Sequence, residues 1–203
     1  MARFFLVRHA EHDYLSRGVA GRKPSIHLNQ RGQAQAQALA ERLSGLRIEA
    51  VLAGPLERAR ETAEPLTSRL NLTLEIAPEF DEIDLGHWTG CTFTELDQMT
   101  SWQQWNAFRS STVPPGGESM LQAQTRAVGK ILQLQQQRAR ASFAIFSHGD
   151  VIRATLVHFL GLHLDFYSRF QIDPASISVF DLEEQSVLIS TLNSKLLGED
   201  LWV

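Results

Sequence analysis

An arginine and a histidine stand side by side at the end of an apolar segment near the start of the chain. Residues 3–7 have the apolar character of a buried β-strand, and Arg8 and His9 follow directly. A guanidinium offers a permanent planar fork to phosphate oxygens. A neutral imidazole nitrogen is a good nucleophile near neutral pH and can carry a phosphoryl group covalently. The pair therefore suits phosphate chemistry, although an isolated Arg-His pair after a strand is more often only a polar loop.

A second histidine occupies the same kind of position far along the chain. Residues 142–146 form another almost fully apolar segment, which ends in Ser147-His148-Gly149-Asp150 before a helical pattern over residues 151–160. Ligands of parallel α/β sheets bind beyond the carboxyl ends of the strands, so two such junctions on neighbouring strands place both histidines in one pocket. Gly149 would let the backbone at the helix start approach a phosphate closely.

A candidate cation follows a third apolar segment. Residues 50–53 precede Gly54-Pro55, and a helical pattern then resumes, because proline is tolerated in a first helical turn. Arg58 falls in that turn, on the carboxyl side of the strand, where it could reach the same phosphate. Arg60 is instead interpreted as part of a solvated face with the neighbouring glutamates.

These motifs and one further motif occur in a fixed order along the chain. The series is Arg8-His9, residues 55–59, Glu82 ahead of residues 86–90, and residues 147–149. In this order the chain resembles the histidine phosphatase superfamily, the phosphoglycerate mutase-like group, over essentially all 203 residues. Within that group it is most similar to a small branch of phosphomutases or phosphatases, on the strength of residues 21–24, 27–29, 115–119 and 173–176.

The resemblance implies a role for each matching residue. His9 would be the nucleophile that becomes phosphohistidine. Arg8, Arg58 and His148 would bind the transferring phosphoryl group beside Gly149. His148 would also take part in catalysis. The sequence departs from the family at Leu15, because many members have an asparagine there that contacts the phosphate. That contact is in doubt, but no charged member of the site is lost.

Glu82 matches the family's proton donor. A carboxylic acid gives a proton near neutral pH only if its surroundings raise its pKa. Burial against Ile83 and Trp88 would raise the pKa of Glu82 and the cationic cluster would lower it, and the sequence leaves that balance open. Asp81 and Asp84 are rival donors on chemistry alone, so Glu82 is preferred by its register in the motif.

Three loop histidines, His12, His27 and His87, are secondary candidates for substrate contact. Metal binding is disfavoured, since the chain has no His-Glu-x-x-His pair, no Cys-His framework and no calcium-type carboxylate loop. We therefore expect no metal and no other cofactor, as the family also implies.

The composition fits a compact enzyme. With 203 residues, 43% hydrophobic and 21% charged, one domain over residues 1–203 is the expectation. A net charge of −4 argues against a basic surface for nucleic acid.

No stretch approaches a membrane span of about 20 residues, and the first apolar run is too short for a signal peptide. One cysteine, Cys91, excludes an intrachain disulfide. We expect a cytoplasmic protein whose partner is a small phosphorylated metabolite, with no nucleic acid or membrane partner, and homodimer formation is left open.

Apolar residues at helical spacing predict a helix over residues 30–43 that faces the sheet, with Asn29 as its N-cap. Further helices are predicted over 55–70, 92–108, 119–138 and 150–160. The predicted strands are 3–7, 50–53, 72–76, 142–146 and a final hairpin, 176–182 with 186–192. This alternation predicts an α/β fold, a three-layer α/β/α sandwich with a mostly parallel sheet. The resemblance adds one antiparallel strand, for which the hairpin is the natural place. Residues 13–28 and 93–117 should form the pocket rim and set substrate choice.

Two classes of function stay open. The first is a phosphatase or a phosphoglycerate mutase-type phosphomutase that uses His9, and the second is a catalytically weak relative that binds phosphorylated ligands or protein partners. The complete charged set favours an enzyme. The compact rim favours hydrolysis, because a mutase must keep a bisphosphorylated intermediate away from water. The sequence therefore predicts a metal-independent phosphatase of small phosphate monoesters that forms a phosphohistidine.

Overall fold

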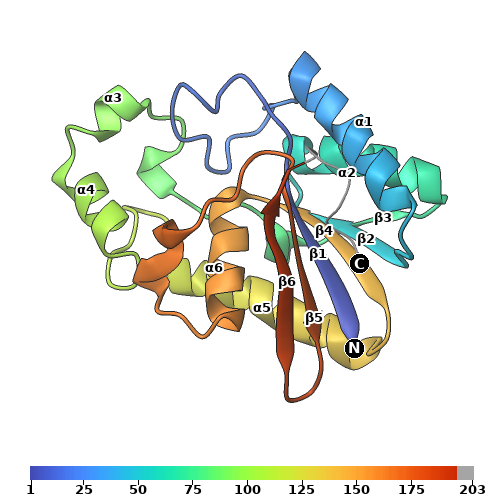
Figure 1. Cartoon of the computed structure of the whole chain (residues 1–203). Helices are drawn as coiled ribbons and strands as arrows, with labels where there is room; N and C mark the ends of the chain where they lie inside the picture. Colours follow the sequence, from blue (N-terminus) through green and yellow to red (C-terminus); the bar gives the residue numbers. More distant parts are fainter. Residues whose placement is uncertain (196–203) are drawn as a thin grey trace.

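Six strands form one mixed sheet in the computed structural model, which describes residues 1–195 (Figure 1). Their order is β3-β2-β4-β1-β5-β6. The β1–β4, β4–β2 and β2–β3 pairs are parallel, whereas β5 runs antiparallel to both β1 and β6. The prediction of a mostly parallel sheet with one antiparallel strand in the final hairpin is confirmed. The bounds are β1 (Ala2–Arg8), β2 (Ala50–Ala53), β3 (Leu74–Ile76), β4 (Ser142–Ser147), β5 (Ile177–Leu182) and β6 (Val187–Ser194).

Helices cover both faces of this sheet. On β1, Phe4 and Leu6 pack into a core shared with α5 (Met120–Gln137) and α6 (Gly149–Phe159). The alternate residues, Phe5 and Val7, pack into a second core with α1 (Gln30–Ser44) and α2 (Glu57–Leu70). Successive side chains of a strand point to opposite faces, so a continuous apolar run is what a sheet buried on both sides requires. The predicted three-layer sandwich is confirmed.

The long helices begin close to their predicted positions. Asn29 caps α1 as predicted, because its side-chain oxygen accepts a hydrogen bond from the backbone N–H of Gly32 at 2.8 Å. Helix α2 begins at Glu57 rather than Pro55, since Leu56 is still extended. Arg58 nevertheless lies in its first turn, as the sequence analysis expected.

The prediction of one helix over residues 92–108 is wrong. The chain forms two short helices there, α3 (Phe93–Leu96) and α4 (Thr100–Ala107). Leu96 is the buried residue of α3 and Trp105 that of α4. At 3.6 residues per turn these two positions would lie on opposite sides of a continuous helix, so the break lets both side chains enter the same core.

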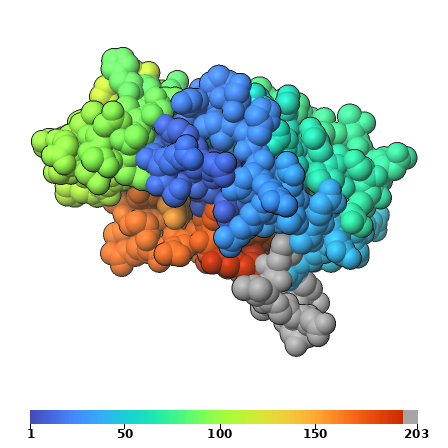
Figure 2. Space-filling model, turned by 90° about the horizontal axis from the view of Figure 1, so that it is seen from above, coloured from blue at the N-terminus to red at the C-terminus, as the bar shows by residue number. Residues whose placement is uncertain are grey.

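Three short 3₁₀ helices complete the described elements: η1 (Pro78–Phe80), η2 (Gly86–Trp88) and η3 (Leu164–Arg169). Seen from above, the loop after β1 lies in the middle of the surface beside the segment that holds α3 and α4 (Figure 2). No helix within residues 1–195 is both long and apolar enough to cross a membrane. Residues 196–203 of the predicted domain lie outside the described part of the chain.

Candidate active site

The carboxyl ends of β1 and β4 bring the two predicted histidines together. The strands are direct neighbours, with Arg8 opposite Ser147 in the register, and the ring centroids of His9 and His148 are 5.2 Å apart. Arg8, His9 and Arg58 line a pocket of about 300 Å³ with Glu82 and Gly149. His148 is fully buried beside His9 and is not among the described residues that line the pocket. The structure therefore brings all the predicted site residues to one place.

His9 is held in one tautomer. Its Nδ1 lies 2.8 Å from the carbonyl oxygen of Ala10, which can only accept, so Nδ1 carries the proton in the neutral ring. Nε2 then keeps its lone pair. Burial, followed by the charges of Arg58 and Arg8, holds the pKa of His9 well below its usual range. The ring is therefore neutral at physiological pH.

Both predicted phosphate-binding arginines keep buried N–H groups that no described residue accepts. These are Nε of Arg8 and both Nε and Nη1 of Arg58. Their other contacts anchor them: Arg8 donates to the carbonyl of Ile172 at 2.6 Å, and Arg58 donates to the carbonyl of Gly21 at 2.8 Å. Buried donors without partners destabilise a fold, so such a cluster indicates a place for an anion.

The start of helix α6 adds to this positive potential. His148 is its N-cap residue but makes no side-chain capping bond, and neither of its ring nitrogens has a hydrogen-bond partner among the described residues. Helix N-termini favour anions. A Cβ atom on Gly149 would lie 3.2 Å from the guanidinium carbon of Arg8, so glycine lets this arginine lie against the helix start.

The structure settles the balance that the sequence leaves open at Glu82. Burial, followed by the charge of Asp150, raises the pKa of Glu82 to about 7, although Arg58 and Arg8 oppose the shift. Its carboxylate lies in the pocket wall, 3.7 Å from Nδ1 of His148. The rivals are placed elsewhere: Asp81 accepts from the backbone N–H of Glu82, and neither Asp81 nor Asp84 is among the described residues that line the pocket.

Several lining residues are not predicted individually from the sequence. Arg109 is buried, stacks between the rings of Trp105 and Tyr167 at 4.3 Å from each centroid, and pairs with Asp150 at 3.1 Å. Arg153 also approaches Asp150, at 3.6 Å. Part of the signal was available, because Asp150 adjoins the Ser-His-Gly motif and Arg109 lies in the predicted rim.

The three secondary histidine candidates differ in burial and in their position relative to the pocket. His12 is buried, lines the pocket, and its ring centroid is 5.1 Å from that of His9. Its Nδ1 accepts from the backbone N–H of Tyr14 at 3.2 Å, and burial lowers the pKa of His12 to about 4. His27 and His87 are exposed and lie outside the described lining. Leu15, at the position where the family often has asparagine, presents an apolar side chain to the pocket wall.

Comparison with known proteins gives the family and relatives of this chain. The profile of the histidine phosphatase superfamily (branch 1) matches residues 4–195. The chain is 29% identical to phosphoserine phosphatase 1 of Hydrogenobacter thermophilus, over 95% of this chain and 92% of that protein. It is 26% identical to the adenosylcobalamin/alpha-ribazole phosphatase of Escherichia coli, over 97% and 98% of the two chains.

Solved structures share the fold. YhfR of Bacillus stearothermophilus superposes with a TM-score of 0.89 at 24% identity, over 96% of this chain and 98% of that one. The alpha-ribazole phosphatase of Shigella flexneri gives 0.85 at 26% identity, over 98% and 99%. The fold and relatives define a phosphoric monoester hydrolase with a phosphoglycerate mutase-like fold, as predicted. The chain belongs to the histidine phosphatase superfamily.

Proposed function

We propose that this protein is a metal-independent phosphatase of small phosphate monoesters and that the substrate's phosphoryl group is transferred to His9 before it is hydrolysed. The observation that carries the proposal is a neutral histidine with a free Nε2 beside two arginines whose buried N–H groups lack partners among the described residues. A phosphate monoester carries close to two negative charges. Its transfer needs positioning and charge stabilisation more than covalent activation, which is what these groups can supply.

The first half-reaction moves the phosphoryl group to the enzyme. Arg8, Arg58 and His148 hold the phosphate oxygens at the start of α6, and Nε2 of His9 attacks phosphorus. The new N–P bond forms as the bond to the ester oxygen breaks. Glu82 gives its proton to the departing alkoxide, which leaves as the alcohol. A pKa of about 7 keeps a large fraction of this carboxyl protonated near neutral pH.

The second half-reaction returns the enzyme to its starting state. The carboxylate of Glu82, now without its proton, accepts one from a water molecule as that water attacks phosphorus. The N–P bond breaks, and inorganic phosphate leaves. The same residue thus acts first as an acid and then as a base, which is the reverse proton transfer that the second displacement requires.

The relatives favour hydrolysis over the phosphomutase alternative. The curated relatives compared above are phosphatases, and their names refer to phosphate esters of small molecules. A pocket of about 300 Å³ suits the same substrate class here. The cytoplasmic location and the single domain over residues 1–203 stay predictions from the sequence, and homodimer formation stays open.

The test compares wild type with His9→Ala in p-nitrophenyl phosphate hydrolysis, with a chelator present, from about pH 5 to 8. We expect turnover by the wild type and a loss on the order of 10³-fold or more in the variant, because a nucleophile has no substitute in a two-step mechanism. His27→Ala is the matched control, since this exposed histidine lies outside the described pocket lining, and it should keep full activity. Turnover by His9→Ala, or loss of wild-type turnover in chelator, would refute the proposal.

A further inference from the structure

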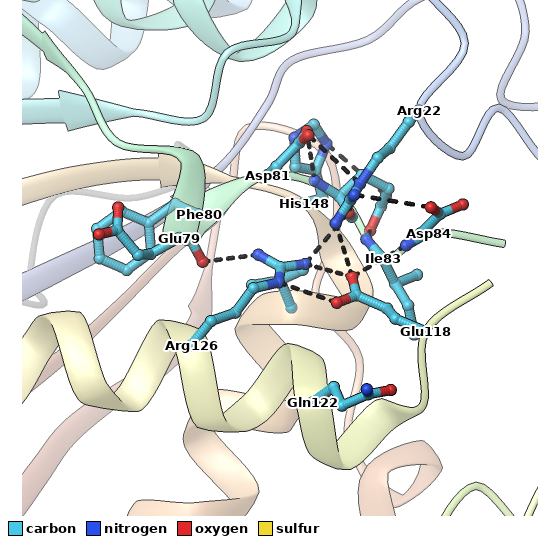
Figure 3. Close-up of polar contacts among 12 residues, drawn as sticks. Arg22, Glu79, Phe80, Asp81, Ile83, Asp84, Glu118, Gln122, Arg126 and His148 are labelled. Atoms are coloured by element: carbon cyan, nitrogen blue, oxygen red, sulfur yellow. Dashed lines mark hydrogen bonds and ion pairs between the residues drawn. The ribbon is translucent and has the colours of Figure 1, made fainter. Parts of the chain in front are cut away.

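Two arginines from distant parts of the chain hold the backbone of Glu82 through hydrogen bonds. Its carbonyl oxygen accepts from Nε of Arg22 at 2.8 Å and from Nη2 of Arg126 at 3.2 Å. Arg22 belongs to the loop after β1, and Arg126 belongs to helix α5. Arg126 also donates through Nη1 to the carbonyl of Glu79 at 2.7 Å (Figure 3). Both arginines therefore act on the backbone that places the carboxylate.

One carboxylate joins the two arginines. Oε1 of Glu118 accepts from Nη2 of Arg22 at 2.8 Å and from Nη2 of Arg126 at 2.7 Å, as Figure 3 shows. The same oxygen accepts from the backbone N–H of Asp84 at 3.0 Å, and Oε2 accepts from Nε of Arg126 at 3.2 Å. Glu118 thus ties both arginines to the far side of the Glu82 loop, which we define as residues 81–85.

This loop needs such support. Residues 81–85 lie between η1 and η2 and belong to no helix or strand. A proton donor is effective only when it sits within hydrogen-bond reach of the leaving oxygen, and an error of 1 Å can cost about 10²-fold in rate. The three residues are only partly exposed, with side chains 35%, 16% and 19% accessible for Arg22, Glu118 and Arg126. Partial burial strengthens their hydrogen bonds relative to those of a solvated ion pair.

The network also reaches the phosphate side of the pocket. Gly21, next to Arg22, accepts through its carbonyl from Nη2 of Arg58 at 2.8 Å. Residues 21 and 22 therefore contact one phosphate-binding arginine and the backbone of the acid at the same time. Two segments that the sequence analysis singled out without a role, 21–24 and 115–119, supply Arg22 and Glu118.

We propose that Arg22, Glu118 and Arg126 form a positioning network that holds the carboxyl of Glu82 at the leaving oxygen of the substrate. The inference rests on the proposed function, because it assigns these residues to the proton-transfer step. None of the three is among the described residues that line the pocket. They act through Glu82, so in the first phosphoryl transfer their loss should slow only esters whose leaving group needs a proton.

The experiment measures kcat and KM for two substrates. p-Nitrophenolate leaves without a proton, whereas the alkoxide of an aliphatic ester such as glycerol phosphate needs one. We expect Glu118→Gln and Arg126→Lys to lower kcat/KM for glycerol phosphate by about 10- to 100-fold while changing kcat/KM for p-nitrophenyl phosphate by less than about threefold, because kcat/KM reports the first phosphoryl transfer. Lys130→Gln is the matched control on α5, because Lys130 pairs with the exposed carboxylate of Glu75, and it should leave both substrates unchanged.

A double substitution separates positioning from a general structural role. In a Glu82→Gln background the acid is already lost, so adding Glu118→Gln should cause no further loss of kcat/KM for glycerol phosphate. Equal losses of kcat/KM for both substrates in Glu118→Gln, or fully additive losses in the double variant, would overturn the network. If Glu82→Gln itself shows equal losses of kcat/KM for both substrates, the acid role in the proposed function is wrong instead. Thermal melting of each variant identifies any that fails to fold, and Arg22→Lys then repeats the test with its charge retained.

Discussion

The proposed phosphate-binding part of the pocket lies on regular structure, whereas the part that carries the proposed acid lies on a loop. Arg8 ends a central strand, and Arg58 lies in the first turn of a helix. Glu82 lies between two 3₁₀ turns and is held by side chains from elsewhere in the chain. The first part takes its geometry from the backbone of the sheet. The second depends on hydrogen bonds that single substitutions can remove.

The two parts also differ in how far their polar groups are satisfied. Arg58 keeps two of its guanidinium nitrogens without a partner among the described residues, although it is almost fully buried. Arg126 uses all three of its guanidinium nitrogens. The phosphate-binding part is therefore organised for a ligand at some expense in stability, and the acid loop is organised for its own rigidity. Substitutions in the two parts should therefore differ in their effects on activity and change the free energy of unfolding with opposite signs.

The largest effect is expected from removing a phosphate-binding cation. Arg58→Ala should lower kcat/KM by about 10³-fold, because an arginine on a transferring phosphoryl group contributes on this scale. Arg60→Ala, two residues along the same helix, is the matched control, since Arg60 is exposed and was interpreted as surface. Steady-state kinetics with p-nitrophenyl phosphate measure both. A loss shared equally by the two variants would place the effect in helix α2 rather than in phosphate binding.

The proposed acid role of Glu82 should appear in the pH dependence of kcat/KM. Glu82 must be protonated to give its proton, and its pKa is about 7, so kcat/KM for glycerol phosphate should fall as the pH rises above about 7. His9 stays neutral throughout this range because its pKa lies well below 6.5. Glu82→Gln should remove the alkaline fall and lower kcat/KM by about 10²- to 10³-fold.

p-Nitrophenyl phosphate supplies the control for this pH profile. Its leaving group needs no proton, so kcat/KM for this ester should show no fall that depends on Glu82 between about pH 7 and 8. The parameter kcat/KM reports the first phosphoryl transfer, which separates this test from the second displacement, in which Glu82 acts as a base. An identical alkaline fall for both esters would assign the titration to a group other than the acid.

The same contrast explains what the sequence could predict. Arg8, His9 and His148 stand where an apolar strand gives way to polar residues, and such a junction is visible in a few consecutive letters. Arg22 and Glu118 form their contact across 96 positions of the chain, so no local pattern announces it. The motif segments around both residues were noticed only as a family likeness. Periodicity likewise failed at residues 92–108, where the core, rather than helix propensity, decides that the helix breaks.

Stability should distinguish the two parts with opposite signs, although the effects are smaller. Arg58→Met should raise the free energy of unfolding by about 1–2 kcal/mol, because it removes a buried cation whose N–H groups are only partly satisfied. Burial lowers the pKa of Arg58, which means that folding disfavours its charged form. Arg126→Met should instead lower the free energy of unfolding by about 2–4 kcal/mol, since it removes two of the hydrogen bonds to the carboxylate of Glu118 and the donor to the carbonyl of Glu79.

Urea unfolding of the two variants and the wild type measures both signs. The midpoint should move up for Arg58→Met and down for Arg126→Met at an unchanged slope with denaturant, which is the mark of altered stability rather than altered compactness. Inorganic phosphate should narrow the gap between Arg58→Met and the wild type, because an anion that binds only the folded state stabilises the chain that can hold it. Destabilisation by Arg58→Met would show that this arginine supports the fold through its bond to Gly21, and the contrast between the two parts of the pocket would then rest on geometry alone.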